Sequence, residues 1–325
     1  MNIIDVKELS RNYGKLVAVD KVSFQVAEGE VFGFLGPNGA GKTTTISMLC
    51  TLLKPTSGEA VLCGHDVIKQ RNQVRRCIGL VFQDPTLDEY LTAEQNLRFH
   101  AYAYHLSKEL REKRINEVLT LVDLSDRRKS KVRTFSGGMK RRLEIARGLL
   151  HNPKVLFLDE PTLGLDPQTR RNIWDFILQL RKQQNLTIFL TTHYMDEAEN
   201  CDRISVIDRG QIIALDTPEK LKDSLGGDVV TLTAEDNQAA LKELKEKFAL
   251  SPEIRDGHIT FSIPQGEMFL PKLTQNFQSR LISIGIHRPT LDDVFLKLTG
   301  RAIRDTEAGE KDQLRRMSQR WRGRR

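Results

Sequence analysis

Residues 36–44 read Gly36-Pro37-Asn38-Gly39-Ala40-Gly41-Lys42-Thr43-Thr44, and the rest of the chain is organised around them. They follow the apolar run 31–35 and precede a helical pattern of apolar residues. A strand, a glycine-rich loop and a helix in this order are typical of a phosphate-binding loop. Glycine lets the backbone N–H groups turn inward, and the helix N-terminus adds a positive dipole end at the same point. We therefore expect this loop to bind a polyphosphate. The alternative, a flexible glycine turn, leaves the strand and the helix unexplained.

Two side chains of the loop have chemistry that suits a nucleotide with its metal ion. The ammonium of Lys42 is expected to reach the β and γ phosphates of the bound ligand. The hydroxyl of Thr43 is expected to complete the ligand shell of Mg²⁺, which prefers oxygen ligands.

A second motif, Leu158-Asp159-Glu160, ends the continuous apolar run 155–158. Such a run is typical of a central strand in a parallel sheet. Both carboxylates then emerge at the sheet edge where the phosphate loop also lies. Asp159 is predicted to hold Mg²⁺ through its water shell, and Glu160 to orient or deprotonate the attacking water. An acidic strand end that caps the next turn is the alternative.

The pattern along the chain divides it into a large and a small domain. Short alternating runs before residue 35 indicate antiparallel strands. From 91 to 150 the pattern is helical and opens with Thr92 and Gln95 at the spacing of a capping box, so we expect a helical subdomain at about 84–150. The predicted parts are an α/β nucleotide-binding domain (1–225), a small α+β domain (226–300), and a polar, basic tail (301–325) that we expect to be disordered.

The positive charge is concentrated at the C-terminus. The net charge is +7, and the last fifteen residues hold seven basic side chains and one acidic one. A nearly neutral body argues against a nucleic-acid partner. The tail is either solvated or weakly attracted to an anionic membrane surface.

Cysteine usage and hydropathy bear on location. The four cysteines form no C-x-x-C pair, which favours reduced thiols in a cytosolic protein. Charged residues interrupt the N-terminus, and no apolar run approaches the length of a membrane span. We expect neither a signal peptide nor a spanning helix, so any work at a membrane requires another chain to cross it.

The segment Phe135-Ser136-Gly137-Gly138-Met139 resembles the signature sequence of the ATP-binding cassette (ABC) ATPases. This resemblance implies a P-loop NTPase fold of the ABC ATPase type, in which a mixed sheet core has an antiparallel β edge and an inserted helical subdomain. It also implies that Ser136, Gly137 and Gly138 contact the γ-phosphate held by the opposite subunit. Helix N-termini favour anions, and we expect the helix to run from Met139 to Leu150. Phe135 and Met139 depart from the commoner Leu and Gln, but the serine and glycines are kept. A flexible interdomain glycine turn is the alternative.

Four further positions match the same family. Tyr13 resembles the aromatic that stacks on adenine, although a tyrosine packed on an edge strand remains open. Gln83 resembles the glutamine that touches the magnesium shell, against the alternative of a solvated turn. Asp166 lies in a segment that resembles the loop at the dimer interface, and His193 resembles the switch histidine that hydrogen-bonds the γ-phosphate.

The segment 289–300 is similar to the closing segment of daunorubicin-resistance type exporter ATPases. That resemblance implies an ATPase that pairs with a separate membrane permease and energises efflux of a drug, an antibiotic or another hydrophobic compound. An ordinary amphipathic helix is the alternative, and both can hold together.

We therefore interpret the chain as the ATP-hydrolysing subunit of an exporter, peripheral to the membrane on its cytoplasmic side. Two copies facing head to tail are expected to form two complete sites, and the groove near Gln83 is the expected docking place for the permease. The rival interpretations are a soluble ABC ATPase that acts on ribosomes or nucleic acid, and a nucleotide-binding regulator that does not hydrolyse ATP.

Overall fold

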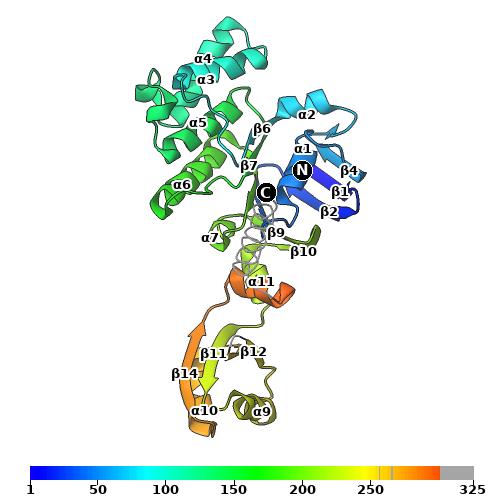
Figure 1. The fold of residues 1–325 in the computed structure, drawn as a ribbon, viewed down its shortest axis with the longest axis vertical. Helices are drawn as coiled ribbons and strands as arrows, with labels where there is room; N and C mark the ends of the chain where they lie inside the picture. The colour runs from blue at the N-terminus through cyan, green and yellow to red at the C-terminus, as the bar shows by residue number, and fades with distance from the viewer. Residues whose placement is uncertain (256, 265, 301–325) are drawn as a thin grey trace, which may run out of the picture. The chain divides into compact units, whose positions relative to one another are not determined.

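The computed structural model describes residues 1–255, 257–264 and 266–300, which form two compact units (Figure 1). The first unit runs from Met1 to Leu215, and the second begins at Asp216. We expected the second unit to begin at residue 226, but it begins about ten residues earlier. The reason is that helix α8 (Pro218–Asp223) packs on the C-terminal helix α11 (Leu291–Thr299). The expected basic tail, 301–325, lies outside the described residues.

An antiparallel sheet forms one edge of the first unit, as the alternating runs predicted. Its strands are β1 (Asn2–Tyr13), β2 (Leu16–Ala27), β4 (Ser57–Leu62) and β5 (His65–Asp66), in the order β2-β1-β4-β5. Buried and exposed residues alternate in the second half of β2, where Val22, Phe24 and Val26 are buried, which is the period of a half-buried strand. Register shifts along β1 interrupt this alternation. In this register Val6 lies opposite Phe24 and Ala60.

A six-stranded sheet in the order β10-β9-β3-β8-β7-β6 forms the centre of the first unit. The pairs from β9 to β6 are all parallel. Strands β3, β7 and β8 are buried along their whole length, which explains their continuous apolar sequences. Their bounds are β3 (Val31–Leu35), β6 (Ile78–Val81), β7 (Val155–Asp159), β8 (Thr187–Thr192), β9 (Arg203–Asp208) and β10 (Gln211–Asp216).

A cluster of phenylalanines joins the two sheets. Phe24 of the antiparallel sheet stacks on Phe32 of β3, with ring centroids 5.5 Å apart. Phe189 of β8 contacts both of them and also Phe157 of β7, whose ring centroid is 5.3 Å away. Burial of each ring stabilises the fold by about 1.5–3 kcal/mol, so this cluster fixes the strands whose ends carry the site.

The expected helical subdomain is present. In Figure 1 its three longer helices gather on one side of the first unit, away from β1, β2 and β4. The predicted capping box is confirmed: Thr92 accepts a hydrogen bond from the backbone of Gln95, and the side chain of Gln95 accepts one from the backbone of Thr92. The subdomain comprises α3 (Ala93–Ala103), α4 (Lys108–Leu121), two short 3₁₀ turns (Ser125–Arg127 and Val132–Thr134) and α5 (Gly137–Leu149).

Four more helices belong to the described part of the first unit. They are α1 (Lys42–Leu49), α2 (Arg71–Cys77), α6 (Pro167–Gln184) and α7 (Met195–Ala198). The sequence did not predict α2, which has a single buried residue, Val74, and therefore shows no apolar periodicity. Among the described residues, no helix is long and apolar enough to cross a membrane.

The second unit has the predicted α+β character. Its antiparallel sheet has the order β12-β13-β11-β14, and the chain passes through it as β-α-β-β-α-β, the ferredoxin-like arrangement. Its core includes Val230, Leu232, Phe261 and Leu273. The elements are β11 (Asp228–Ala234), α9 (Asn237–Phe248), β12 (Glu253–Arg255), β13 (His258–Ile263), α10 (Gly266–Asn276) and β14 (Leu281–His287), flanked by α8 and α11.

Candidate functional site

The loop between β3 and α1 has a backbone that only glycine allows at two positions. A Cβ on Gly36 would lie 2.3 Å from the carbonyl oxygen of Ile207. Gly41 has a φ of 107°, and a Cβ there would lie 2.6 Å from the carbonyl oxygen of Ala18. Gly41 is also the N-cap of α1 and offers no side chain to its first N–H groups. This cradle suits an anion, as the sequence indicated.

Lys42 is buried inside the loop, with 4% of its surface exposed. Its Nζ donates to the carbonyl oxygens of Gly36 at 2.7 Å and Pro37 at 3.1 Å. It also forms an ion pair with Oε1 of Glu160 at 3.1 Å. The ammonium is therefore held at the phosphate loop and is linked directly to the second motif.

Asp159 ends β7 and faces the start of α1. Its Oδ1 accepts hydrogen bonds from the hydroxyl of Thr43 at 3.3 Å and from that of Thr191 at 2.5 Å. Burial raises the pKa of Asp159, although the two hydroxyls lower it in part. Two of the three predicted magnesium ligands, Thr43 and Asp159, thus lie together and offer oxygen atoms to a hard cation.

Glu160 lies between Lys42 and His193. The Nδ1 of His193 is 3.2 Å from Oε2 of Glu160. Burial alone would raise the pKa of Glu160, but the hydrogen bond from His193 and the charge of Lys42 outweigh it, and the net pKa is lowered. The carboxylate therefore stays ionised at neutral pH, as a general base requires.

A cavity of about 220 Å³ joins the loop to the second motif. Gln83 and Glu160 line it together with the loop, which brings the predicted Gln83 to the site. Its other lining residues are Ala18, Pro37, Asn38, Gly39, Gly41, Lys42, Thr43 and Thr44. Ala40 is buried within the same loop.

Other predicted residues lie outside this cavity. Tyr13 is 47% exposed at the end of β1, with the guanidinium of Arg11 over its ring at 4.7 Å. Ser136 is the N-cap of α5 and accepts from the backbone of Met139 at 3.3 Å, and Gly137 is the first residue of the helix. The helix thus begins two residues before the expected Met139, because the serine hydroxyl serves as its cap.

Asp166 and Gly138 lie at the facing ends of two helices. Asp166 caps α6 by accepting from the backbone and hydroxyl of Thr169, at 3.0 and 2.6 Å. A Cβ on Gly138 would lie 2.8 Å from Cγ2 of Thr169, so the second signature glycine allows α5 to pack closely on α6. The predicted signature and the predicted interface loop are therefore neighbours in one chain.

Several residues at the site were not predicted, among them Thr191, Glu197 and Arg141. Thr191 binds Asp159 and also accepts from the backbone N–H of Glu160 at 3.0 Å. Glu197 is buried and accepts from the hydroxyl of Thr192 at 2.7 Å. Arg141 of α5 reaches the carbonyls around Glu160. Two features of the sequence could have pointed to these residues. One is the pair of threonines at the end of an apolar strand, and the other is the spacing of three residues between Arg141 and Glu144 on an amphipathic helix.

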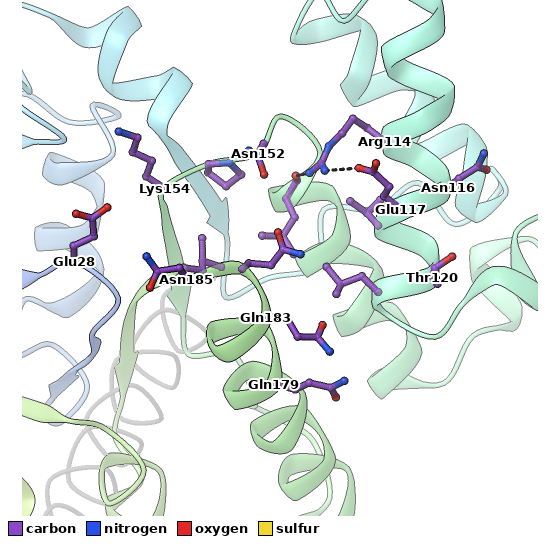
Figure 2. Close-up of a pocket in the computed structure, with 16 residues that line it drawn as sticks. Glu28, Arg114, Asn116, Glu117, Thr120, Asn152, Lys154, Gln179, Gln183 and Asn185 are labelled. Carbon is purple, nitrogen blue, oxygen red and sulfur yellow. Dashed lines mark hydrogen bonds and ion pairs between the residues drawn. The ribbon is translucent and has the colours of Figure 1, made fainter.

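Two larger cavities lie elsewhere in the first unit. Figure 2 shows one of about 850 Å³ between α4 and the C-terminal part of α6, lined mainly by amide and charged side chains. Its Arg114 is already paired with Glu117 and with the carbonyls that end α5. The other cavity, of about 480 Å³, is lined by Phe82, Phe99 and Tyr104 and is more apolar.

Comparison with known proteins gives consistent results. The family described as ABC transporter matches residues 19–163. The linearmycin resistance ATP-binding protein LnrL of Bacillus subtilis (strain 168) is 39% identical over 312 residues, covering 93% of this chain and 100% of that protein. The doxorubicin resistance ATP-binding protein DrrA of Mycobacterium tuberculosis is 41% identical, covering 88% of this chain and 89% of that protein.

Solved structures show the same architecture. The cbiO1 protein from Clostridium perfringens, part of the ABC transporter complex cbiONQ, has a TM-score of 0.64 at 28% identity, covering 76% of this chain and 96% of its own. The ATP-binding cassette MJ0796, in a dimeric post-hydrolysis state bound to ADP and Pi, has a TM-score of 0.58 at 29% identity, covering 66% of this chain and 98% of its own.

Proposed function

Because the chain belongs to the ABC transporter family as an ATP-hydrolysing exporter subunit that uses Mg²⁺, we propose that it drives efflux of a drug, an antibiotic or another hydrophobic compound through a separate membrane permease. The cargo class rests on relatives named for resistance to linearmycin, daunorubicin and doxorubicin, which align along most of the chain. Other relatives are named as Nod factor export proteins, which supports export as the shared activity. These names do not favour action on ribosomes or nucleic acid.

The observation that carries the proposed mechanism is the contact of Glu160 with both Lys42 and His193 beside the phosphate loop. Lys42 would bind the β and γ phosphates and so give up its pairing with Glu160. The freed carboxylate would then take the proton of the attacking water. His193, on the other oxygen of Glu160, would hold that base in place and also donate to the γ-phosphate.

The metal would be held by oxygen atoms of this chain. Thr43 and Gln83 would bind Mg²⁺ directly, and Asp159 would hold it through water. When bound, Mg²⁺ neutralises charge on the β and γ phosphates as the phosphoryl group passes to water. The raised pKa of Asp159 reflects a buried carboxylate for which a nearby cation would compensate.

A second copy of the chain would complete each site. Ser136, Gly137 and Gly138 lie outside the cavity of their own chain. Ser136 caps a helix that begins at Gly137, and the first N–H groups of that helix suit an anion. We propose that two chains pair head to tail, so that this segment and Asp166 close the nucleotide site of the partner. Tyr13, with its exposed ring, would stack on the adenine.

The permease would dock in the apolar groove of about 480 Å³ on the cytoplasmic side of the membrane. Phe99 is 67% exposed in this groove, and Phe82 lines it one residue before Gln83, which lines the nucleotide cavity. A cytoplasmic segment of the permease with an apolar face fits this lining. The groove therefore adjoins Gln83, the residue near which we expected the permease to dock. We also propose that the tail 301–325 contacts anionic lipid, because seven of its last fifteen residues are basic.

Co-purification with the permease tests this proposal. Phe99→Glu should abolish recovery of the permease from detergent-solubilised membranes, because a charge would be buried in the apolar groove. MgATP binding by the variant should be unchanged. Tyr90→Glu is the control, since Tyr90 is exposed but does not line the groove. Equal recovery with Phe99→Glu and wild type would refute the docking site.

A further inference from the structure

The guanidinium of Arg141 is buried behind the site, with 6% of the residue exposed. Its Nε donates to the carbonyl oxygen of Pro161 at 2.6 Å, and its Nη2 donates to those of Asp159 and Glu160 at 3.2 Å each. Its Nη1 donates to the carbonyl oxygen of Phe82 at 2.7 Å. An arginine has five N–H groups in a rigid fork. With the carboxylate of Glu144 as the fifth acceptor, at 2.9 Å from Nη1, every one of them is used.

Glu144 fixes this arginine in place. It lies one turn further along α5 and is 1% exposed. Its Oε2 pairs with Arg141, and its Oε1 accepts from the backbone N–H of Thr86 at 2.8 Å. Both charges of the pair are compensated, which a buried ion pair requires. The pair therefore holds the segment 82–86 on both sides of Gln83.

We propose that Arg141 is a positioning residue for hydrolysis, which ties the loop that carries Glu160 to the loop that carries Gln83. Glu160 has a φ of 44°, a conformation that is strained for any residue other than glycine. A strained backbone persists only where surrounding contacts hold it. Arg141 supplies such contacts, because it donates to the carbonyl oxygens of Asp159, Glu160 and Pro161. The inference rests on the proposed roles of Glu160 and Gln83.

The position of these bonds predicts which kinetic step Arg141 affects. Its hydrogen-bond partners lie at the end of β7 and in the Gln83 segment, and not in the phosphate loop 36–44. Loss of the fork should therefore displace the base and leave phosphate binding intact. A displacement of about 1 Å can lower turnover by about 10²-fold.

Arg141→Lys tests the role, since lysine keeps the charge beside Glu144 and loses the planar fork. In the full-length chain we expect kcat to fall by about 10- to 100-fold while the KM for MgATP stays within about twofold. Arg142→Lys is the matched control. Arg142 is the next residue on the same helix, and its guanidinium donates to the carbonyl oxygen of Val122 and to the carboxylate of Asp123. The kcat of Arg142→Lys should therefore not change. An unchanged kcat for Arg141→Lys, or a fall in kcat matched by lost MgATP affinity and a lower unfolding temperature, would overturn the proposal.

A second variant covers the case in which Arg141→Lys does not fold. Glu144→Gln keeps an amide oxygen for the N–H of Thr86 and removes the carboxylate that fixes Arg141, so this variant should fold and still lose turnover. A folded Glu144→Gln variant with the wild-type kcat would refute the role. Glu160→Gln is measured alongside. If Glu160→Gln hydrolyses ATP at the wild-type rate, Glu160 is not the base. If Glu160→Gln is slow but Arg141→Lys has the wild-type rate, only the positioning role of Arg141 is refuted.

Discussion

Glu160→Gln changes the chemistry of the site with little change in shape. The glutamine can keep the contact with His193, which lies 3.2 Å from Oε2 in the wild type. It cannot accept a proton and carries no charge to pair with Lys42. Loss of a general base lowers kcat by about 10²- to 10⁴-fold.

The same variant should bind MgATP more tightly, for a reason specific to this structure. Unit charges 3.1 Å apart, as in Lys42 and Glu160, attract by about 5 kcal/mol at an effective dielectric constant of about 20. Desolvation offsets much of this attraction, and a hydrogen bond to a charged group contributes about 1.5–3 kcal/mol net. Removing this competitor for Lys42 should therefore tighten MgATP binding by about tenfold or more.

The assay combines single-turnover hydrolysis with equilibrium binding of a fluorescent ATP analogue in the presence of Mg²⁺. Glu59→Gln, an exposed change on β4, is the control and should leave both measurements unchanged. An unaltered hydrolysis rate in Glu160→Gln would show that another group is the base. Equal or weaker binding would show that Glu160 does not compete for Lys42.

Three further predictions concern pH and stability. The lowered pKa of Glu160 predicts that kcat does not fall until the pH drops below the ordinary glutamate range, which a pH–rate profile measures. Glu94→Gln should destabilise the first unit by about 1 kcal/mol at pH 7. Hydrogen bonds from Arg128 and Arg98 hold the pKa of Glu94 at about 2, so this difference is full above about pH 5 and disappears as the pH falls through 2, as urea titrations at pH 7 and pH 2 would show. Phe189→Ala should lower the free energy of unfolding by about 3–5 kcal/mol, since it leaves a cavity among four rings.

The phosphate loop and the Asp159-Glu160 strand end could be predicted because their signals are local. A glycine-rich turn between a strand and a helix, and carboxylates that follow an apolar run, each have a direct physical reason. The sequence also predicted that Lys42 and Glu160 lie close together, because the ends of parallel strands share one edge of the sheet. The α+β character of the second unit was also predicted, because strand-like and helical patterns follow one another along residues 226–300.

The remaining features depend on tertiary contacts that no short segment encodes. Arg141 looks like one more charged residue on an amphipathic helix, and only the fold shows that it points at the carbonyls of the Glu160 loop. Thr191 looks like the end of a strand until Asp159 is placed beside it. Helix α8 is short and packs on α11, about seventy residues later in the chain, so its assignment to the second unit could not be read locally.

The central claim is that each ATP site is shared between two chains, and a mixture of two inactive variants tests it most directly. Lys42→Ala disables the phosphate loop, and Ser136→Arg disables the signature, so each variant alone should be inactive. In a mixed dimer the two defects fall in one site and the other site is intact. A one-to-one mixture should recover about a quarter of the wild-type ATPase rate if subunits exchange freely and the sites act independently. A mixture of two folded variants that stays inactive after exchange would contradict the shared site.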